Sequence, residues 1–248
     1  LALALAREGA RVVVVEAREV AAAASGRNAG FVLAGVAENH VAACRRYGEE
    51  RARRVWRFTR TNQRLLRALA QRHDLDCDLR WHGSAQRAGD DPEWAEVQES
   101  ARLLSAEGAR VRLDEDRREA VYEDDGELHP VRFVRGLARA ALAAGVAVHE
   151  GTRATRATRD ALTTERGTVR AGAVVLCTNA YSEHLATGSR IAPVRGQVLA
   201  TAPLARRVFE RPTYASRGFR YWRQTADGRV VAGGWRDLAV AEETGEDE

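Results

Sequence analysis

An acidic residue at the end of an apolar run is the first feature of the sequence with chemical meaning. Four valines, Val12–Val15, lead to Glu16, and a loop of small residues, Ala24–Gly30, follows. A carboxylate at a strand tip can accept hydrogen bonds from ribose hydroxyls, and a loop of small residues lets backbone N–H groups approach phosphate. This order of features is typical of the second half of a dinucleotide-binding βαβ unit.

The first thirty residues contain further polar groups and the end of a helix. Ser25 and Asn28 can donate hydrogen bonds, and Arg27 can offset phosphate charge. Leu1–Gly9 has the pattern of the last turns of a helix, with Gly9 as its cap. We therefore expect the first strand and the Gly-rich turn of the unit upstream of Leu1, and the chain to be an internal piece of a larger protein.

Composition limits the classes of partner. The chain has 248 residues, and all 39 basic residues are arginine, a bias that GC-rich coding explains. These arginines alternate with 35 acids, as in the helical pairs Glu49–Arg53 and Glu50–Arg54, so we expect no nucleic-acid partner. Cys44, Cys77 and Cys177 form no close pair and no metal-type spacing, which indicates reduced thiols, a cytoplasmic protein and no metal site. No apolar run reaches the ~20 residues needed to span a bilayer.

Helical and strand patterns alternate along the chain. Helical periodicity predicts helices over 39–73, where Val55, Phe58, Leu65, Leu66 and Leu69 recur at helical spacing, and over 91–107 and 131–144. The valine run of 11–17 predicts a parallel strand buried on both faces, and 114–125 is expected to be a loop or short turn. Other apolar or β-branched runs predict strands over 110–113, 146–150, 152–158, 162–166, 168–170, 173–177, 194–201, 219–224 and 229–232, with a hairpin turn at 226–228.

The order of these elements predicts an α/β fold with two interleaved domains. Residues 1–38 and 128–188 are expected to form a Rossmann-like dinucleotide-binding domain. Residues 39–127 and 189–248 are expected to form a second domain of helices and an antiparallel sheet. Such a chain leaves its nucleotide-binding domain twice, which is typical of two-domain flavoenzymes.

Six segments, in this order, resemble the D-amino-acid oxidase superfamily of FAD-dependent oxidoreductases. The closest likeness is to its glycine/D-amino-acid oxidase and γ-glutamylputrescine oxidase-like branch. The segments are Val15–Ala17, Ala24–Gly30, Glu150–Ala154, Val174–Tyr181, Pro193–Gln197 and Asp227–Gly234. The resemblance covers nearly the whole chain and implies FAD as the cofactor.

The resemblance also implies roles for individual residues. Glu16 would bind the adenosine ribose, and Ala154 stands where the family often has valine, so it would keep a backbone contact to adenine with less apolar cover. Cys177 is expected to be a buried structural thiol. Tyr221, Arg223 and Arg236 lie where the superfamily holds a substrate carboxylate, for which an arginine fork is suited. The implied cofactor-binding set is Glu16, Ala17, Arg18, Ser25, Gly26, Arg27, Asn28, Ala29, Gly30, Ala154, Cys177, Thr178 and Asn179.

The implied activity is oxidation of the CH–NH bond of a small amine or amino acid to an imine, with oxygen as electron acceptor. No residue is nominated as a catalytic base. Two alternatives remain open: an FAD-dependent dehydrogenase that passes electrons to a quinone or carrier, and a non-catalytic fragment or basic binding module. The sequence contains no lysine, although some members of the superfamily use a lysine near the flavin ring.

Overall fold

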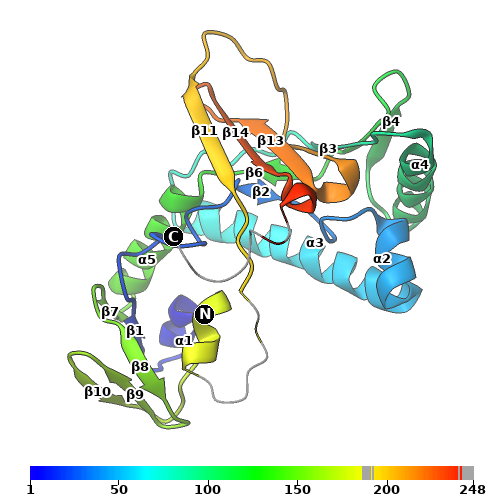
Figure 1. Ribbon diagram of the computed structural model, residues 1–248. Coiled ribbons are helices and arrows are strands. Elements are labelled where there is room, and N and C mark those ends of the chain that lie inside the picture. Colours follow the sequence, from blue (N-terminus) through cyan, green and yellow to red (C-terminus); the bar gives the residue numbers. More distant parts are fainter. Residues whose placement is uncertain (186–190, 192, 240, 242–248) are drawn as a thin grey trace. The chain divides into compact units, whose positions relative to one another are not determined.

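The computed structural model describes residues 1–185, 191, 193–239 and 241, and its elements belong to two compact units (Figure 1). Unit 1 comprises the described residues of 1–27, 134–196 and 239–248, and unit 2 comprises 28–133 and 197–238. The chain therefore changes unit at 27/28, 133/134, 196/197 and 238/239. The domain boundary expected at 188/189 lies outside the described residues, and the assignment of cofactor and substrate binding to two domains stays a prediction.

Unit 1 contains a short parallel pair of strands and a small antiparallel sheet. Strand β1 (Val13–Val15) pairs in parallel with β7 (Ala147–His149), from Val13 opposite Ala147 to Val15 opposite His149. The second sheet has the order β10-β9-β8 (Gly167–Arg170, Ala161–Thr164 and Ala154–Ala157), and two helical elements, α1 (Ala2–Arg7) and the 3₁₀-helix η1 (Asn179–His184), belong to the same unit. Helix α5 (Pro130–Ala143) enters it from unit 2.

Two strand expectations for unit 1 are wrong. Val13 is exposed, so the valine strand is not buried on both faces. Among the described residues, β7 is its only ladder partner. Residues 173–177 form no strand, and Val175 is exposed. An apolar run becomes a strand only where a neighbouring strand receives its backbone hydrogen bonds, and no described strand lies beside this run.

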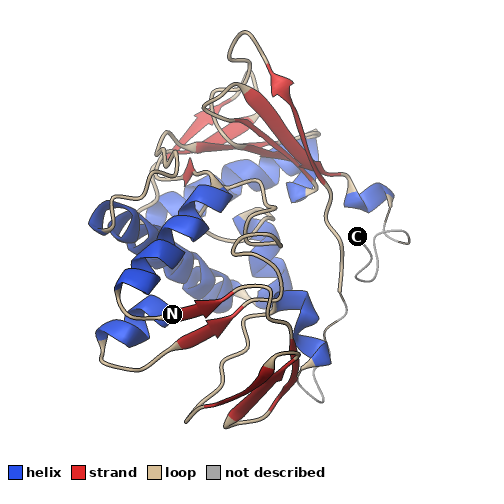
Figure 2. Cartoon of the chain, turned by 90° about the vertical axis from the view of Figure 1, so that its left-hand side faces the viewer, coloured by secondary structure: helices blue, strands red, loops and turns tan. Residues whose placement is uncertain are grey.

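Unit 2 is built on a seven-stranded sheet, drawn in red at the top of Figure 2. Its order is β11-β14-β13-β12-β3-β5-β4, and β12 and β3 are the one parallel pair of neighbours in it. The bounds are β11 Val198–Pro203, β14 Arg229–Gly234, β13 Arg220–Gln224, β12 Thr213–Ala215, β3 Ser84–Arg87, β5 Glu119–Tyr122 and β4 Val111–Asp114. A separate antiparallel pair joins β2 (Phe31–Val32) to β6 (Gly126–Glu127).

The sequence misplaced parts of this sheet. The expected loop 114–125 contains β5, whose Ala120 packs with Val97 and Ala101 of helix α4 (Asp91–Ala106) in a buried cluster. The strand expected from Val194 begins at Val198 instead. In the sequence, β5 is flanked on both sides by charged residues, so no local pattern predicts that it is buried. Its burial comes from packing against α4 and from its neighbours β3 and β4 in the sheet.

The single helix expected over 39–73 is two helices, α2 (His40–Tyr47) and α3 (Glu49–Arg72), separated by Gly48. Gly48 has φ +85°, a left-handed conformation that glycine adopts at little cost and that ends α2. The Asn39 side chain caps α2 by accepting a hydrogen bond from Ala42 N at 2.8 Å, and Asp90 caps α4 in the same way through Glu93 N. The expected Glu49–Arg53 pair is confirmed at 2.6 Å.

Helix α3 lies along one side of the sheet of unit 2, as Figure 1 shows. Its buried residues are Ala52, Trp56, Gln63 and Ala70. Phe58, one of the apolar residues at helical spacing, is 74% exposed, and Leu65 is exposed as well. The periodicity thus located the helix, but of its five apolar residues only Val55, Leu66 and Leu69 are half-buried. No described helix combines the length and the apolar composition needed to cross a bilayer.

Candidate functional site

In unit 1, the carboxyl ends of β1 and β7 form a closely tied backbone cluster around Glu16. Glu16 N donates to His149 O at 2.9 Å, and Thr152 N donates to Glu16 O at 2.8 Å. The half-buried Glu16 carboxylate turns back on the strand tip, where Oε1 accepts from Arg18 N at 2.9 Å. Gly151 N donates to Arg18 O at 2.7 Å. Glu16, Ala17 and Arg18 are therefore held in one place by the residues that follow β7.

The loop that follows contains the change of unit at 27/28. Gly26 N and Arg27 N donate to Ala23 O at 2.9 and 3.0 Å, which closes a turn in unit 1. Ser25, Arg27 and Asn28 are exposed, whereas Ala29 and Gly30 are buried. Exposed polar side chains next to buried small residues suit a loop that meets a ligand on one side and packs against protein on the other.

The remaining expected cofactor residues lie elsewhere in unit 1. Ala154 begins β8 and is half-buried. Cys177 is exposed, so the expectation of a buried thiol is wrong; it lies in the segment that forms no strand. The Thr178 hydroxyl lies 2.8 Å from the Ser182 hydroxyl, and Asn179 has φ +50° at the start of η1.

These residues fit a dinucleotide by the chemistry of their donors and acceptors. Glu16 offers a carboxylate at a strand tip, which can accept hydrogen bonds from a ribose diol. Arg27 offers an exposed guanidinium for phosphate, and residues 173–178 form no helix or strand and have no ladder partner in the described chain. The set could therefore hold the sugar and phosphate parts of a dinucleotide.

In unit 2, the end of the same loop meets the seven-stranded sheet through three aromatic rings. Phe31, directly after Gly30, lies edge-on to Tyr214 of β12 at 5.1 Å and to Tyr221 of β13 at 5.9 Å between ring centroids. The two tyrosine rings are themselves 5.8 Å apart. Burial raises the pKa of Tyr214 to about 12, so its hydroxyl stays protonated at neutral pH. We call these three residues the aromatic triad.

Tyr221 also explains why its partner strand carries glycine. Tyr221 is opposite Gly233 in the β13–β14 ladder, and a Cβ on Gly233 would collide with the Tyr221 hydroxyl. Gly234 has φ +110°, and a Cβ there would collide with Phe219 O. Gly233 therefore lets the Tyr221 ring lie against the strand backbone, and Gly234 lets the backbone of Phe219 approach.

Two arginines of the expected substrate set differ in their surroundings. Arg223 is 4% exposed, and its Nη1 lies 3.5 Å from Oε2 of the buried Glu127. Burial lowers the pKa of Arg223, and the Glu127 carboxylate opposes that change. Arg236, in the 3₁₀-helix η3 (Arg236–Leu238), is half-buried, and its Nε is buried without a hydrogen-bond partner in the described structure. The Nε of Arg223 is likewise buried without a hydrogen-bond partner in the described structure, but the Arg223 guanidinium faces the Glu127 carboxylate. Of the two, Arg236 is therefore the one that the described residues leave without a carboxylate.

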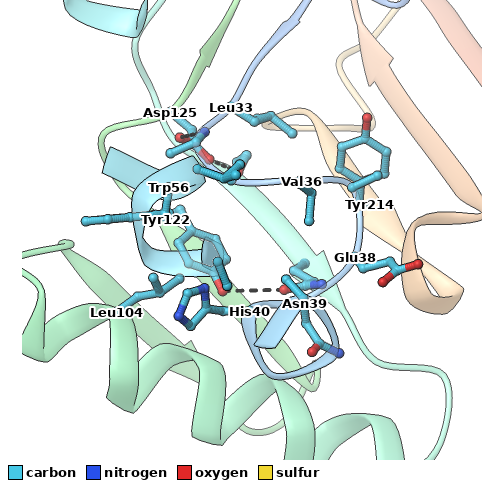
Figure 3. Close-up of a pocket in the computed structure, with 18 of the residues that line it drawn as sticks. Leu33, Val36, Glu38, Asn39, His40, Trp56, Leu104, Tyr122, Asp125 and Tyr214 are labelled. Atoms are coloured by element: carbon cyan, nitrogen blue, oxygen red, sulfur yellow. Dashed lines mark hydrogen bonds between the residues drawn. The ribbon is translucent and has the colours of Figure 1, made fainter. Parts of the chain in front are cut away.

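A cavity of about 60 Å³ lies next to the aromatic triad, under the segment 33–40 (Figure 3). Tyr214, Trp56 and Leu104 contribute to its walls. At one side, Asp125 accepts hydrogen bonds from Ser84 Oγ at 2.6 Å, Gln63 Nε2 at 2.7 Å and Ala34 N at 3.2 Å. Burial raises the pKa of Asp125 to about 6, although these three donors oppose the rise.

The structure thus brings Gly30, Tyr221 and Arg223 together in unit 2, and Glu16, Ala17 and Arg18 together in unit 1. Sequence reasoning missed Phe31, Tyr214, Glu127 and Asp125. Phe31 follows directly on the Gly30 loop, which is a signal that could have found it. Asp125 ends the segment 114–125 that was expected to be a loop, and Glu127 lies two residues after it; the structure shows that both are buried.

Comparison with known proteins identifies the family. A family model described as FAD dependent oxidoreductase matches residues 1–247. The gamma-glutamylputrescine oxidoreductase of Escherichia coli (strain K12) is 28% identical over 260 residues, which cover 94% of this chain and 61% of that protein. A probable oxidoreductase OrdL of Haemophilus influenzae is 24% identical over 265 residues, with the same two shares. The chain spans about three fifths of the length of these curated relatives.

Solved structures share the fold. Glycine oxidase from Geobacillus kaustophilus superposes with a TM-score of 0.74 at 18% identity, over 93% of this chain and 66% of that one. L-proline dehydrogenase from P. horikoshii superposes with a TM-score of 0.76 at 17% identity, over 94% and 66%. The resemblance to the D-amino-acid oxidase superfamily, the mixed α/β flavoprotein fold and FAD as the family's cofactor are confirmed. The chain belongs to the DAO family of FAD-dependent oxidoreductases.

Proposed function

We propose that the protein oxidises the CH–NH bond of an amino acid or amine to an imine, with oxygen as the electron acceptor. The family match over residues 1–247 supports an FAD-dependent oxidoreductase. The observation that carries the choice of substrate is Arg236, whose Nε is buried without a partner among the described residues. A buried donor without an acceptor is costly, so an anionic group of the substrate would stabilise this arginine.

The chain's own residues would bind and orient the two reactants. FAD, when bound, supplies the acceptor for the hydride that leaves the substrate carbon next to nitrogen. Glu16 would hold the adenosine ribose, and Arg27 would offset the charge of the pyrophosphate. The other residues proposed to contact FAD, many of them through the backbone, are Ala17, Arg18, Ser25, Gly26, Asn28, Ala29, Gly30, Ala154, Cys177, Thr178 and Asn179.

The substrate would lie against Tyr221, with its carboxylate on Arg236. The guanidinium fork offers two parallel donors to a carboxylate, which fixes the direction of the substrate as well as its position. The half-buried rings of the aromatic triad would exclude water from the apolar part of the molecule. Proximity and orientation of this kind account for a large part of enzymatic rate enhancement.

The test compares an amino acid with the amine that lacks its carboxylate. In the full protein loaded with FAD, Arg236→Lys is expected to raise KM for the amino acid about tenfold, which corresponds to about 1.4 kcal/mol, and to leave KM for the amine nearly unchanged. Arg229→Lys is the matched control, because Arg229 is exposed and pairs with Asp227 at 3.0 Å. Equal KM changes for both substrates would contradict a carboxylate role.

Electron acceptor and cofactor are tested in the same preparation. Release of peroxide during turnover supports oxygen as acceptor, and turnover that requires added quinone supports the dehydrogenase alternative instead. A colourless wild-type protein that cannot be reconstituted with FAD would reject both. Strong, salt-sensitive binding to random DNA would then favour a basic binding module.

A further inference from the structure

A buried ion-pair group lies next to the Gly30 turn in unit 2. Glu127 is 1% exposed, and its Oε1 accepts a hydrogen bond from Arg80 Nη2 at 2.6 Å. Its Oε2 lies 3.5 Å from Arg223 Nη1. Removing one partner of a buried ion pair leaves an uncompensated charge and is strongly destabilising. Glu127 and Arg223 therefore fix each other's position.

The backbone of the same group reaches the turn directly. Glu127 is opposite Phe31 in the β2–β6 ladder, and Leu128 N donates to Gly30 O at 2.8 Å. On its other side, Glu127 exchanges two backbone hydrogen bonds of 2.9 Å with Arg80. The residue whose carboxylate holds Arg223 is thus part of the backbone that holds the turn.

The Arg223 guanidinium packs against Gly30 as well. Gly30 has φ +73°, and its N donates to Asn28 Oδ1 at 2.9 Å within the turn. A Cβ on Gly30 would collide with Leu128 O and would lie 2.9 Å from Arg223 Nη2. Arg223 Nη2 and the Leu128 backbone therefore occupy the space that a side chain at residue 30 would take.

We propose that Arg223 and Glu127 are positioning residues that hold the Gly30 turn in the arrangement that suits the bound flavin, and that Arg223 does not bind substrate. The proposal rests on the proposed function, because the turn bears on the reaction only if residues 25–30 contact FAD. Arg223 is buried against Glu127 and Gly30, whereas a carboxylate ligand must reach the space that the substrate enters. Arg236, which is half-buried and lies on a different element, remains the residue proposed to bind the substrate carboxylate.

The first experiment needs no cofactor. In the full protein without FAD, Arg223→Gln and Glu127→Gln are each expected to speed hydrogen exchange of the amides of residues 29–32 at least about tenfold, because the turn loses its support. Arg223→Lys keeps the charge but loses the fork and is expected to give an intermediate rate. The control is Arg229→Gln, which removes an exposed ion pair on neighbouring strand β14 and is expected to leave this exchange unchanged.

The second experiment uses the FAD-loaded protein. Arg223→Gln and Glu127→Gln are expected to shift the visible absorbance of the flavin and to lower kcat, while KM changes less than about twofold, since ground-state binding of the substrate is untouched. Arg223→Lys is expected to restore part of kcat. If Arg223→Gln does not fold, Arg223→Lys and Glu127→Gln carry the same comparison.

The opposite pattern would overturn the proposal. Wild-type exchange and absorbance in Arg223→Gln, with a raised KM confined to substrates that bear a carboxylate, would make Arg223 a direct substrate ligand. Unchanged exchange in both the Arg223 and the Glu127 variants would also reject the positioning role. If the wild-type protein binds no FAD, the proposed function fails, and the exchange measurement still decides whether Arg223 and Glu127 support the turn.

Discussion

At the scale of single residues, Gly30 combines an unusual backbone conformation with a lack of space. Gly30→Ala would place a Cβ at φ +73° against Leu128 O. Gly35→Ala is the matched variant, because Gly35 has φ +86° but its nearest neighbour, Trp56 Cδ1, is 3.6 Å from the added Cβ. We expect Gly35→Ala to cost about 1 kcal/mol of unfolding free energy from backbone strain alone, and Gly30→Ala to cost at least about 2 kcal/mol more. Urea unfolding of both variants measures the difference; equal losses would contradict it.

Asp125 is expected to make stability depend on pH. Its pKa in the folded protein is about 6, above the ordinary 3.8, so the folded state holds the proton more tightly than the unfolded state. The unfolding free energy should therefore fall as pH rises from about 4 to about 6, by on the order of 2–3 kcal/mol. Asp125→Asn keeps the shape and removes the charge, so it should abolish this fall.

The measurement is the difference in unfolding free energy between variant and wild type across that pH range. The difference should move in favour of Asp125→Asn as pH rises. The neighbouring Asp124→Asn is the control, because Asp124 pairs with Arg60 and Arg110 and its loss should not produce a gain of that sign. Parallel curves for Asp125→Asn and wild type would show that the buried carboxyl has no raised pKa.

At the scale of elements, α3 carries two aromatic residues with opposite surroundings only two positions apart. Trp56 is 4% exposed and lines the cavity of Figure 3, whereas Phe58 is 74% exposed. We expect Trp56→Ala to cost about 3–5 kcal/mol of unfolding free energy and Phe58→Ala less than about 0.5 kcal/mol. Thermal and urea unfolding of the two variants test this. A large loss for Phe58→Ala would mean that something covers this face in solution.

The same helix shows how far local pattern determines an element. Helices α4 and α5 were found because capping residues, proline and glycine mark their ends within the sequence. The break at Gly48 was missed because a glycine in a helical pattern can be tolerated or can end the helix. Strands β2, β3, β6 and β12 have two to four residues each and depend on ladders to residues distant in sequence. No local pattern encodes such pairing.

The candidate site divides in the same way. Glu16 was found because a carboxylate after a run of valines is a local signal with a chemical meaning. Glu127 was missed because its role depends on three partners distant in sequence: Phe31, Arg80 and Arg223. Arg223 was assigned to substrate by its place in the resemblance to the superfamily, and only its burial against Glu127 and Gly30 indicates a different role. The residue types were thus readable from sequence, and their surroundings were not.

At the scale of the whole molecule, neither unit is formed by one continuous stretch of chain. A ligand that binds only the folded protein stabilises it by mass action, by about 2.7 kcal/mol at a concentration one hundred times its dissociation constant. If FAD is that ligand, the melting temperature should rise with FAD concentration. The rise should depend on the carboxylate of Glu16, which lies at the strand tip of unit 1.

Glu16→Gln keeps the shape of the side chain, and an amide oxygen can still accept from Arg18 N, but the charge that strengthens hydrogen bonds from a diol is lost. We expect FAD to bind about tenfold or more weakly, since a hydrogen bond to a charged group is worth about 1.5–3 kcal/mol. Glu19→Gln is the matched control, because Glu19 is exposed and pairs with Arg135 at 3.3 Å. Titration of the full protein by flavin fluorescence gives the FAD affinity of the wild type and of each variant. Equal affinities in wild type and Glu16→Gln would show that Glu16 does not bind the ribose.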